Sequence, residues 1–304
     1  MKAVLPKQRV EGYIMTIWDA LLQGIIQGLT EFLPVSSSGH LSLVQHFTGF
    51  SQDMGLMFTI LLHCGTLAAV IIAFWRQIWD MIIEFGVSVM DIFKGRFSFK
   101  DMSPRRRMLV MIIVSLFPLI PAYFVSDYYE QLSCDSNILV EGICFLITAA
   151  LLFFADRSTG GKKTEGEIKY SDSLLIGVTQ AFLAPLPGVS RSGSTISVGM
   201  MRGLTREYAV AFSFIIGIPP VLASNLLNIP DAIEAGADVG FGILVVGMAV
   251  SAVVGFLAIK MVKWLIKTDK FVWFAWYTAV LGVLTIIAAI IEMASGQTIL
   301  QMLA

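Results

Sequence analysis

Six long apolar stretches constrain this chain more than any other feature of its sequence. Each is long enough to cross the hydrocarbon core of a bilayer as a helix. Of the 304 residues, 56% are hydrophobic and only 14% are charged, against ~25% charged in ordinary soluble domains. This composition excludes a soluble enzyme, a disordered chain and a nucleic-acid binder. The sequence therefore predicts an all-α polytopic membrane protein with transmembrane helices at 56–75, 108–125, 138–155, 208–228, 240–264 and 271–292.

Two further regions are apolar but interrupted by polar residues, proline and glycine. They lie at about 17–50 and 173–206, and neither holds an unbroken apolar run of ~20 residues. Broken segments are tolerated at membrane depth only where protein or a cavity surrounds them, so we expect two re-entrant helical hairpins. The expected order is an N-terminal extension (1–16), repeat one (17–155), a cytoplasmic loop (156–172), repeat two (173–292) and a C-terminal tail (293–304).

The two interrupted regions resemble each other in sequence. Gly-Ile-Ile-Gln at 24–27 matches Gly-Val-Thr-Gln at 177–180, and Ser-x-Ser-Gly at 36–39 matches Ser-x-Ser-Gly at 190–193. Each unit holds one hairpin and three spans. Because three is odd, we expect the second unit to be inverted in the membrane relative to the first. Inverted repeats with broken helices place their site near the midplane, where the two breaks meet.

The charges of the loops predict which way the spans run. Loops 76–107, 156–172 and 260–270 are rich in Lys and Arg, whereas 126–137, 229–239 and the C-terminal tail contain none. Basic loops stay in the cytoplasm, so the C-terminus is expected outside, with hairpin one entering from outside and hairpin two from inside. The side of the basic N-terminus stays open, because a full crossing at 14–35 would place it inside.

The first interrupted region contains the densest polar cluster, which includes Gln27, Glu31, Ser36, Ser37 and His40. Gln27 and Glu31 are four residues apart and share one helix face. A carboxylate inside an apolar segment is costly and marks a functional site by default. The other histidine in an apolar run, His63, is expected to pack rather than react.

The second interrupted region offers a permanent cation, hydroxyls and flexible glycines. Arg191 is followed closely by Ser192, Gly193, Ser194 and Thr195. If a helix begins there, its free N–H groups face the same point as the guanidinium, which is the arrangement of a phosphate site. Together the two clusters supply the groups that phosphoryl transfer needs. With so few acids, a loosely held divalent cation, Mg²⁺ or Ca²⁺, would need substrate phosphates to complete its coordination.

The two clusters resemble the signatures of bacterial undecaprenyl-diphosphate phosphatases, the integral-membrane family linked to bacitracin resistance. Residues 27–40 are similar to (E/Q)xxxE…PVSSxGH, residues 187–195 are similar to PGxSRSxxT, and the likeness runs from about Trp18 to Glu292. The resemblance implies hydrolysis of undecaprenyl diphosphate to the monophosphate carrier lipid for cell-wall synthesis, in the plasma membrane of a bacterium. It also implies a divalent-metal requirement, a site that opens to the extracytoplasmic face, and a homodimer. The site residues that carry over are Glu31, Ser37, His40, Ser190, Arg191 and Thr195, with Gln27 and Gln180 beside them.

The working mechanism assigns roles to these residues. Arg191 and the Ser192–Thr195 amides grip the diphosphate, with Ser36 and Ser190 beside it. Glu31, with Gln27, positions the metal or a water, and His40 is the general acid or base that activates Ser37 as nucleophile. Two alternatives stay open: direct attack by metal-activated water, and phosphorylation of His40 itself.

A rival function from another class is a lipid-phosphate transporter or flippase, because inverted repeats with broken helices are a transporter design. Transport needs selectivity groups but no nucleophile and base. The combination of Glu31, Ser37, His40 and Arg191 therefore favours the hydrolase, and release of phosphate by the detergent-solubilised protein would distinguish the two.

Overall fold

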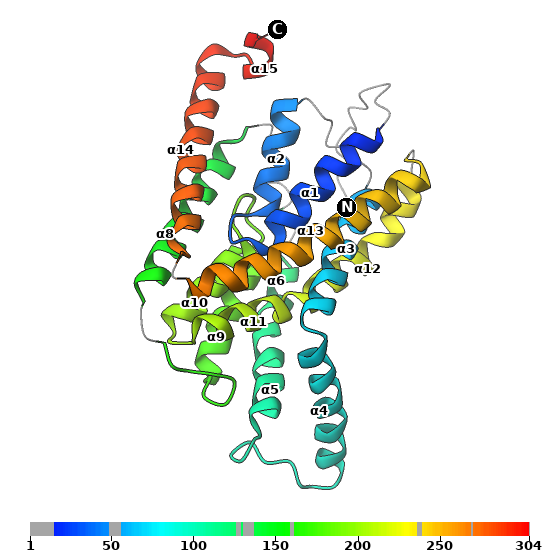
Figure 1. Cartoon of the computed structure of the whole chain (residues 1–304), viewed down its shortest axis with the longest axis vertical. Helices are drawn as coiled ribbons and strands as arrows, with labels where there is room; N and C mark the ends of the chain where they lie inside the picture. The colour runs from blue at the N-terminus through cyan, green and yellow to red at the C-terminus, as the bar shows by residue number, and fades with distance from the viewer. Residues whose placement is uncertain are drawn as a thin grey trace.

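The computed structural model describes residues 15–48, 56–125, 129, 137–158, 161–235, 239–268 and 270–303, and these form an assembly of helices (Figure 1). The isolated bridge between Lys163 and Leu204 is the only β-type pairing among them. The helices in chain order are α1 (Ile17–Phe32), α2 (Ser37–Thr48), α3 (Leu56–Ala73), α4 (Trp75–Phe93), α5 (Pro104–Leu116), α6 (Leu119–Tyr123), α8 (Leu139–Arg157), α9 (Tyr170–Val178), the π-helix η1 (Thr179–Leu183), α10 (Arg191–Met201), α11 (Arg206–Ile216), α12 (Ile218–Ala235), α13 (Phe241–Lys267), α14 (Val272–Ser295) and α15 (Ile299–Leu303).

Six helical segments in the described part of the chain are long and apolar enough to cross a membrane, which confirms the prediction of an all-α polytopic membrane protein. Each overlaps one of the six predicted spans. Two of them are built from consecutive helices: α5 with α6, and α11 with α12. The segments are Leu56–Ala73, Pro104–Tyr123, Leu139–Arg157, Arg206–Glu234, Phe241–Lys267 and Val272–Ser295.

Both interrupted regions form helix–turn–helix units. The first unit joins α1 to α2, and the second joins α9 and η1 to α10. With 16 and 12 residues in the first unit, no single helix reaches the ~20 residues that a full crossing needs. The α1 helix begins at a capping box in which Thr16 and Asp19 exchange hydrogen bonds. The re-entrant placement of the two units and the proposed domain limits stay predictions, and residues 1–14 of the N-terminal extension lie outside the described residues.

Each helix–turn–helix unit packs against spans of the other half of the chain. The α1 helix lies along α13, and α9 lies correspondingly along α5. The equivalent spans of the two halves also meet directly, α3 against α12 and α8 against α14. This reciprocal exchange is the pattern that two halves related by an internal twofold axis produce, and it supports the internal repeat read from the sequence.

The repeated glycines explain how closely these helices approach. A Cβ at Gly24 would lie 2.9 Å from the carbonyl oxygen of Gly247 in α13. At the matching position, a Cβ at Gly177 would overlap the carbonyl oxygen of Ser115 in α5. Small residues at such contacts are how membrane helices gain packing where no hydrophobic effect separates helix from lipid. The same residue therefore performs the same task in both halves.

The loop before the second unit is fixed by the buried carboxylate of Asp172. One of its oxygens accepts a hydrogen bond from Lys163 at 2.7 Å and the other accepts one from Arg202 at 2.9 Å. Burial alone would raise the pKa of Asp172, but the hydrogen bonds from Lys163, the Lys169 amide and Arg202 outweigh it and hold the pKa below its usual value. The carboxylate therefore stays ionised at neutral pH and holds the start of α9 in place.

One end of the molecule carries basic loops. The α4–α5 loop and the α8–α9 loop lie toward the lower end in Figure 1, and the C-terminus lies at the upper end. Near this end α4 packs against α5, and Arg106 of α5 contacts Glu84 at 2.7 Å and Asp91 at 2.6 Å. The orientation of the spans expected from the loop charges stays a prediction.

We expect Gly177→Ala to lower the stability of the protein by about 1–3 kcal/mol, because the new methyl group meets backbone atoms of Ser115 that cannot move aside. The matched control is Gly86→Ala in α4, where a Cβ meets nothing within 4 Å and alanine should be neutral or stabilise by about 0.5–1 kcal/mol. Unfolding of both variants in detergent checks this, and equal stability of the two would contradict the close contact.

Candidate functional site

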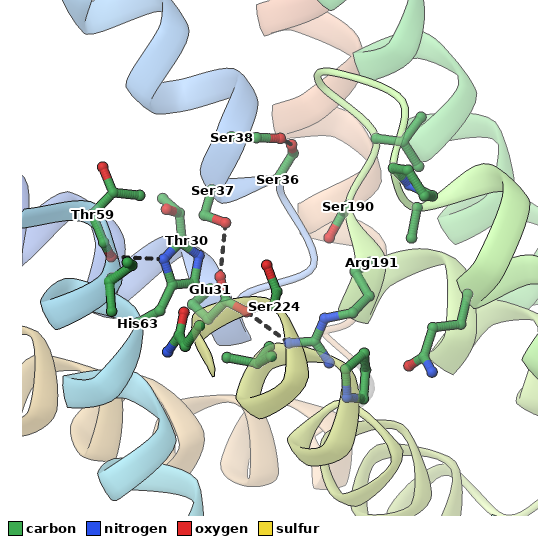
Figure 2. A pocket seen from close by; sticks show the side chains of 18 of the residues that line it. Thr30, Glu31, Ser36, Ser37, Ser38, Thr59, His63, Ser190, Arg191 and Ser224 are labelled. Atoms are coloured by element: carbon green, nitrogen blue, oxygen red, sulfur yellow. Dashed lines mark hydrogen bonds and ion pairs between the residues drawn. The ribbon is translucent and has the colours of Figure 1, made fainter. Parts of the chain in front are cut away.

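The two turns meet at a cavity of about 450 Å³, shown close up in Figure 2. The turns contribute polar groups from both units, and α3 and α12 form the other walls. The predicted site residues on its lining are Glu31, Ser36, Ser37, Gln180, Ser190 and Arg191. The structure thus brings the two sequence clusters together between the halves, as the inverted-repeat argument predicted.

The two turns have the same internal hydrogen bonds. Ser36 Oγ accepts from the Gly39 amide at 3.2 Å and lies 3.3 Å from Ser38 Oγ. In the second turn, Ser190 Oγ accepts from the Gly193 amide at 3.0 Å and lies 3.3 Å from Ser192 Oγ. Each serine caps the helix that follows it. The Ser-x-Ser-Gly match in the sequence is therefore a match in structure.

Ser36 has a φ of 75°, which is rare for a residue with a side chain. The second turn also contains a left-handed residue, and there it is a glycine, Gly188, with a φ of 92°. Strained backbone of this kind costs of order 1–3 kcal/mol and is concentrated at functional sites. The conformation brings Ser36 and Ser37 to face the cavity from the start of α2.

Glu31, near the end of α1, is the centre of the cluster. Its Oε2 accepts hydrogen bonds from Ser37 Oγ at 2.8 Å and from Gln27 Nε2 at 3.1 Å. Its Oε1 accepts from Arg191 Nη2 at 2.7 Å, which ties the two halves together across the cavity (Figure 2). Ser37 and Arg191 are the first residues of α2 and α10, and they are equivalent positions of the repeat. The Glu31 carboxylate thus accepts hydrogen bonds from two residues, Ser37 and Arg191, that occupy equivalent positions in the two halves.

The guanidinium of Arg191 lies over Gly217, at the junction between α11 and α12. A Cβ on Gly217 would overlap Arg191 Nη1, so the guanidinium occupies space that the absent side chain leaves free. Positions 58 and 212 are both Phe and are 154 residues apart, as are the two Ser-x-Ser-Gly motifs. The same offset makes His63 the first-half equivalent of Gly217. At each of the two equivalent pairs, Ser37 with Arg191 and His63 with Gly217, one half has a large side chain and the other a small one or none.

Three buried polar atoms at this site have no hydrogen-bond partner among the described residues. They are Gln27 Oε1, Gln180 Oε1 and Arg191 Nη1. An unsatisfied buried polar group costs about 1–3 kcal/mol, and most such groups in native proteins are paired. Gln180 and Arg191 line the cavity and Gln27 lies beside Glu31, but the three unpaired atoms are themselves buried, so a ligand would reach them only if neighbouring side chains moved.

His40 does not join this cluster. Its Nδ1 donates to the carbonyl oxygen of Ser36 at 2.6 Å, and its Nε2 lies 2.8 Å from the hydroxyl of Tyr277 in α14. The ring stacks on Tyr277 and meets Phe145 edge-on. Although His40 is only three residues after Ser37 in α2, its ring packs against Phe145 of α8 and Tyr277 of α14. The structure shows no contact through which His40 could activate Ser37, whose hydroxyl is bonded to Glu31 instead.

The predicted phosphate grip after Arg191 lies below the cavity surface. The side chains concerned are buried, and the Gly193 amide is used by the Ser190 cap. Thr195 Oγ1 lies 2.6 Å from Ser213 Oγ and bonds the carbonyl oxygen of Arg191. A phosphate contact for these residues stays a prediction, and the geometry gives them a role in holding α10. The residues are Ser192, Gly193, Ser194 and Thr195.

His63 lines the cavity, and its Nδ1 also makes a contact within its own helix, 2.9 Å from the carbonyl oxygen of Thr59. Sequence reasoning gave it little weight because its neighbours in α3 are apolar. Its equivalence to Gly217 is a signal that could have identified it. On the α12 wall the polar lining residues are Ser224, Asn225 and Asn228.

A divalent cation would find few protein ligands here. The described residues contain no group of three His, Cys, Asp or Glu side chains placed to hold a metal. Glu31 and the open Oε1 of Gln27 are hard oxygen donors of the type that Mg²⁺ and Ca²⁺ take. The donor set fits a cation that substrate phosphates also coordinate, and it does not fit an all-protein metal cage.

Comparison with known proteins gives a consistent result. A family model described as "Bacitracin resistance protein BacA" matches residues 20–284. Relatives named undecaprenyl-diphosphatase include proteins of Methanosphaera stadtmanae (37% identical over 282 residues, 91% of this chain and 100% of the relative), Alkaliphilus metalliredigens (37% over 279 residues, 91% and 100%) and Bacteroides fragilis (37% over 280 residues, 90% and 99%).

We expect Glu31→Gln and Arg191→Met each to cost about 3–5 kcal/mol of stability, because each leaves a poorly solvated charge without its partner. The double variant should cost about 1–3 kcal/mol less than the sum of the two. Denaturation in detergent measures this, with Asp80→Asn as the control. Asp80 pairs with Arg105 at a solvent-exposed position, so that change should stay within about 1 kcal/mol. Additive losses would mean that the pair is not coupled.

Proposed function

The chain belongs to the BacA family of bacitracin resistance proteins, and from this we propose that it removes the terminal phosphate of undecaprenyl diphosphate. The products are undecaprenyl phosphate, the carrier lipid of cell-wall synthesis, and inorganic phosphate. The observation that carries the proposal is the joint contact of Ser37 and Arg191 with Glu31 at a cavity between membrane spans. A multi-pass membrane protein with such a site suits a substrate whose tail stays in the bilayer.

Arg191 binds the terminal phosphate in this mechanism. The side chain lines the cavity and its Nη2 is held by Glu31, while Nη1 is buried without a hydrogen-bond partner and is the donor that remains unused. A guanidinium keeps its charge at any working pH and matches phosphate geometry. In a cavity shielded from bulk water, its attraction for charge on the transferring phosphoryl group is stronger than it would be in water.

Ser37 is the nucleophile and Glu31 its base. Ser37 Oγ attacks the terminal phosphorus, Glu31 takes the hydroxyl proton, and the bond to the bridging oxygen breaks, so that undecaprenyl phosphate leaves with its electron pair. Water then attacks the phosphoserine, hydrogen phosphate leaves, the water's proton passes to solvent, and Glu31 returns its proton to Ser37. His40 holds the turn through the Ser36 carbonyl group and Tyr277.

A bound divalent cation would supply charge neutralisation for the diphosphate. Glu31 and Gln27 Oε1 are the protein groups that would hold it. The apolar part of the cavity lining, which includes Leu56, Ile60, Leu119 and Val221, suits the first isoprene units of the lipid.

We place the protein in the plasma membrane with the cavity open to the extracytoplasmic face, following the loop charges. The transporter alternative is not favoured, because the named relatives are phosphatases.

In detergent micelles, where no transport between compartments exists, we expect the wild-type protein to release inorganic phosphate from C55 and C15 prenyl diphosphates. Ser37→Ala should lose at least about 10³-fold in kcat, together with any acid-stable phosphoenzyme trapped by rapid quenching. Arg191→Ala should lose at least about 10²-fold. A Ser37→Ala protein that still hydrolyses would point to direct attack by water, and near-normal Arg191→Ala would refute the phosphate grip.

Removal of divalent ions with EDTA is expected to suppress hydrolysis, and Mg²⁺ or Ca²⁺ should restore it, because the protein itself offers few cations to the diphosphate. Gln27→Leu removes the open Oε1 and should raise the metal concentration for half-maximal activity about tenfold or more. Gln27→Glu adds a carboxylate of the same length and should lower it. Full activity in EDTA would remove the metal from the proposal.

A further inference from the structure

His63 presents an unused hydrogen-bond acceptor to the cavity. Its Nδ1 lies 2.9 Å from the carbonyl oxygen of Thr59 in the preceding turn of α3. A carbonyl oxygen only accepts, so Nδ1 carries the hydrogen and Nε2 of the neutral ring carries a lone pair. Nothing in the described part of the chain donates to Nε2. His40 differs in this respect, because both of its ring nitrogens are engaged.

The ring of His63 faces the reacting groups. It lines the same cavity as Glu31 and Ser37, and Figure 2 shows it next to Glu31. The two side chains are close enough to interact electrostatically. From α10 the charged group facing the cavity is Arg191, and α12 contributes only neutral side chains to the lining. The stretch of α13 packed behind His63, around Ser251, has no ionisable residue.

The proposed reaction has one step for which the Glu31 cluster provides no free acceptor. The second step needs a water held beside the phosphorus of phosphorylated Ser37, and an attacking water is oriented by a group that accepts its hydrogen bond. At that stage Glu31 still holds the proton taken from Ser37, and its oxygens also accept hydrogen bonds from Gln27 and Arg191, so it is not free to accept one from the water. Nε2 of His63 is a free acceptor on the same cavity.

We infer that His63 orients the water that breaks down the phosphoenzyme, an inference that rests on the proposed function. Nε2 accepts a hydrogen bond from the water, whose oxygen attacks the phosphorus as the bond to Ser37 Oγ breaks. Oγ regains the proton held by Glu31, and the second proton of the water is released to solvent with the phosphate. The role is orientation by an acceptor, so a neutral amide of similar reach can perform it.

The test compares His63→Leu with His63→Gln in steady-state hydrolysis of a C15 prenyl diphosphate in micelles. Leucine has no acceptor, so kcat should fall about 10²-fold with KM within about threefold. Glutamine supplies an amide oxygen and should keep kcat within about tenfold of the wild type. Rapid quenching of His63→Leu should show a burst of prenyl phosphate close to one per protein, with phosphoserine accumulating at Ser37.

The control variant is Thr285→Val, which removes a buried hydroxyl bonded to the backbone of α14 far from the cavity and should leave both constants unchanged. His63→Leu with wild-type kcat would overturn the inference, as would a loss that appears in KM or one that glutamine does not rescue. If His63→Leu proves unfolded in detergent, His63→Met takes its place as the variant without an amide acceptor. Its kcat should again fall relative to that of His63→Gln while KM stays similar. A wild-type protein that hydrolyses nothing overturns the proposed function, and this inference with it; hydrolysis by the wild type with an insensitive His63→Leu overturns the inference alone.

Discussion

The ion pair between Glu31 and Arg191 is the interaction on which the arrangement of the two halves depends. Charges of opposite sign from residues 160 apart in sequence meet at 2.7 Å, with side chains only 9% and 19% exposed. Taking either charge out of water alone would cost several kcal/mol, so the pair favours the arrangement in which the two turns face each other. The same contact leaves Ser37 on one carboxylate oxygen and frees one guanidinium nitrogen. The Glu31–Arg191 pair thus both holds the two halves together and forms part of the proposed reaction site.

Much of the fold could be predicted because the sequence signals were long and periodic. Each span is a run of apolar residues with few charges, and the bilayer fixes its minimum length. The convergence of the two turns also followed from the repeat, since Ser36 and Ser190 occur in matching motifs. The motifs could not show in which direction each side chain of a helix turn points. Ser37 and His40 are three residues apart, and only packing against Phe145 and Tyr277 decides that the serine faces the cavity and the histidine does not.

Two other details depended on contacts between distant segments. The burial of Ser192 and Thr195 results from α10 packing on α8 and α11, which no local pattern reveals. His63 sits among apolar neighbours, so its sequence context resembles that of a packed residue. It reaches the cavity because the turns and α12 form the other walls of the space beside that part of α3. Local sequence thus identified the groups available for chemistry, and the tertiary structure selected among them.

The glycine beneath Arg191 has a consequence for how such a site arises from a duplication. A symmetric ancestor would present two identical side chains at positions 37 and 191, which could not be both nucleophile and cation. In this chain the large residue at 191 lies where residue 217 has no side chain, and the small residue at 37 lines the same cavity as the ring at 63. Unequal side-chain volumes at equivalent positions thus allow a twofold-symmetric backbone to place the nucleophile on one half and the cation on the other.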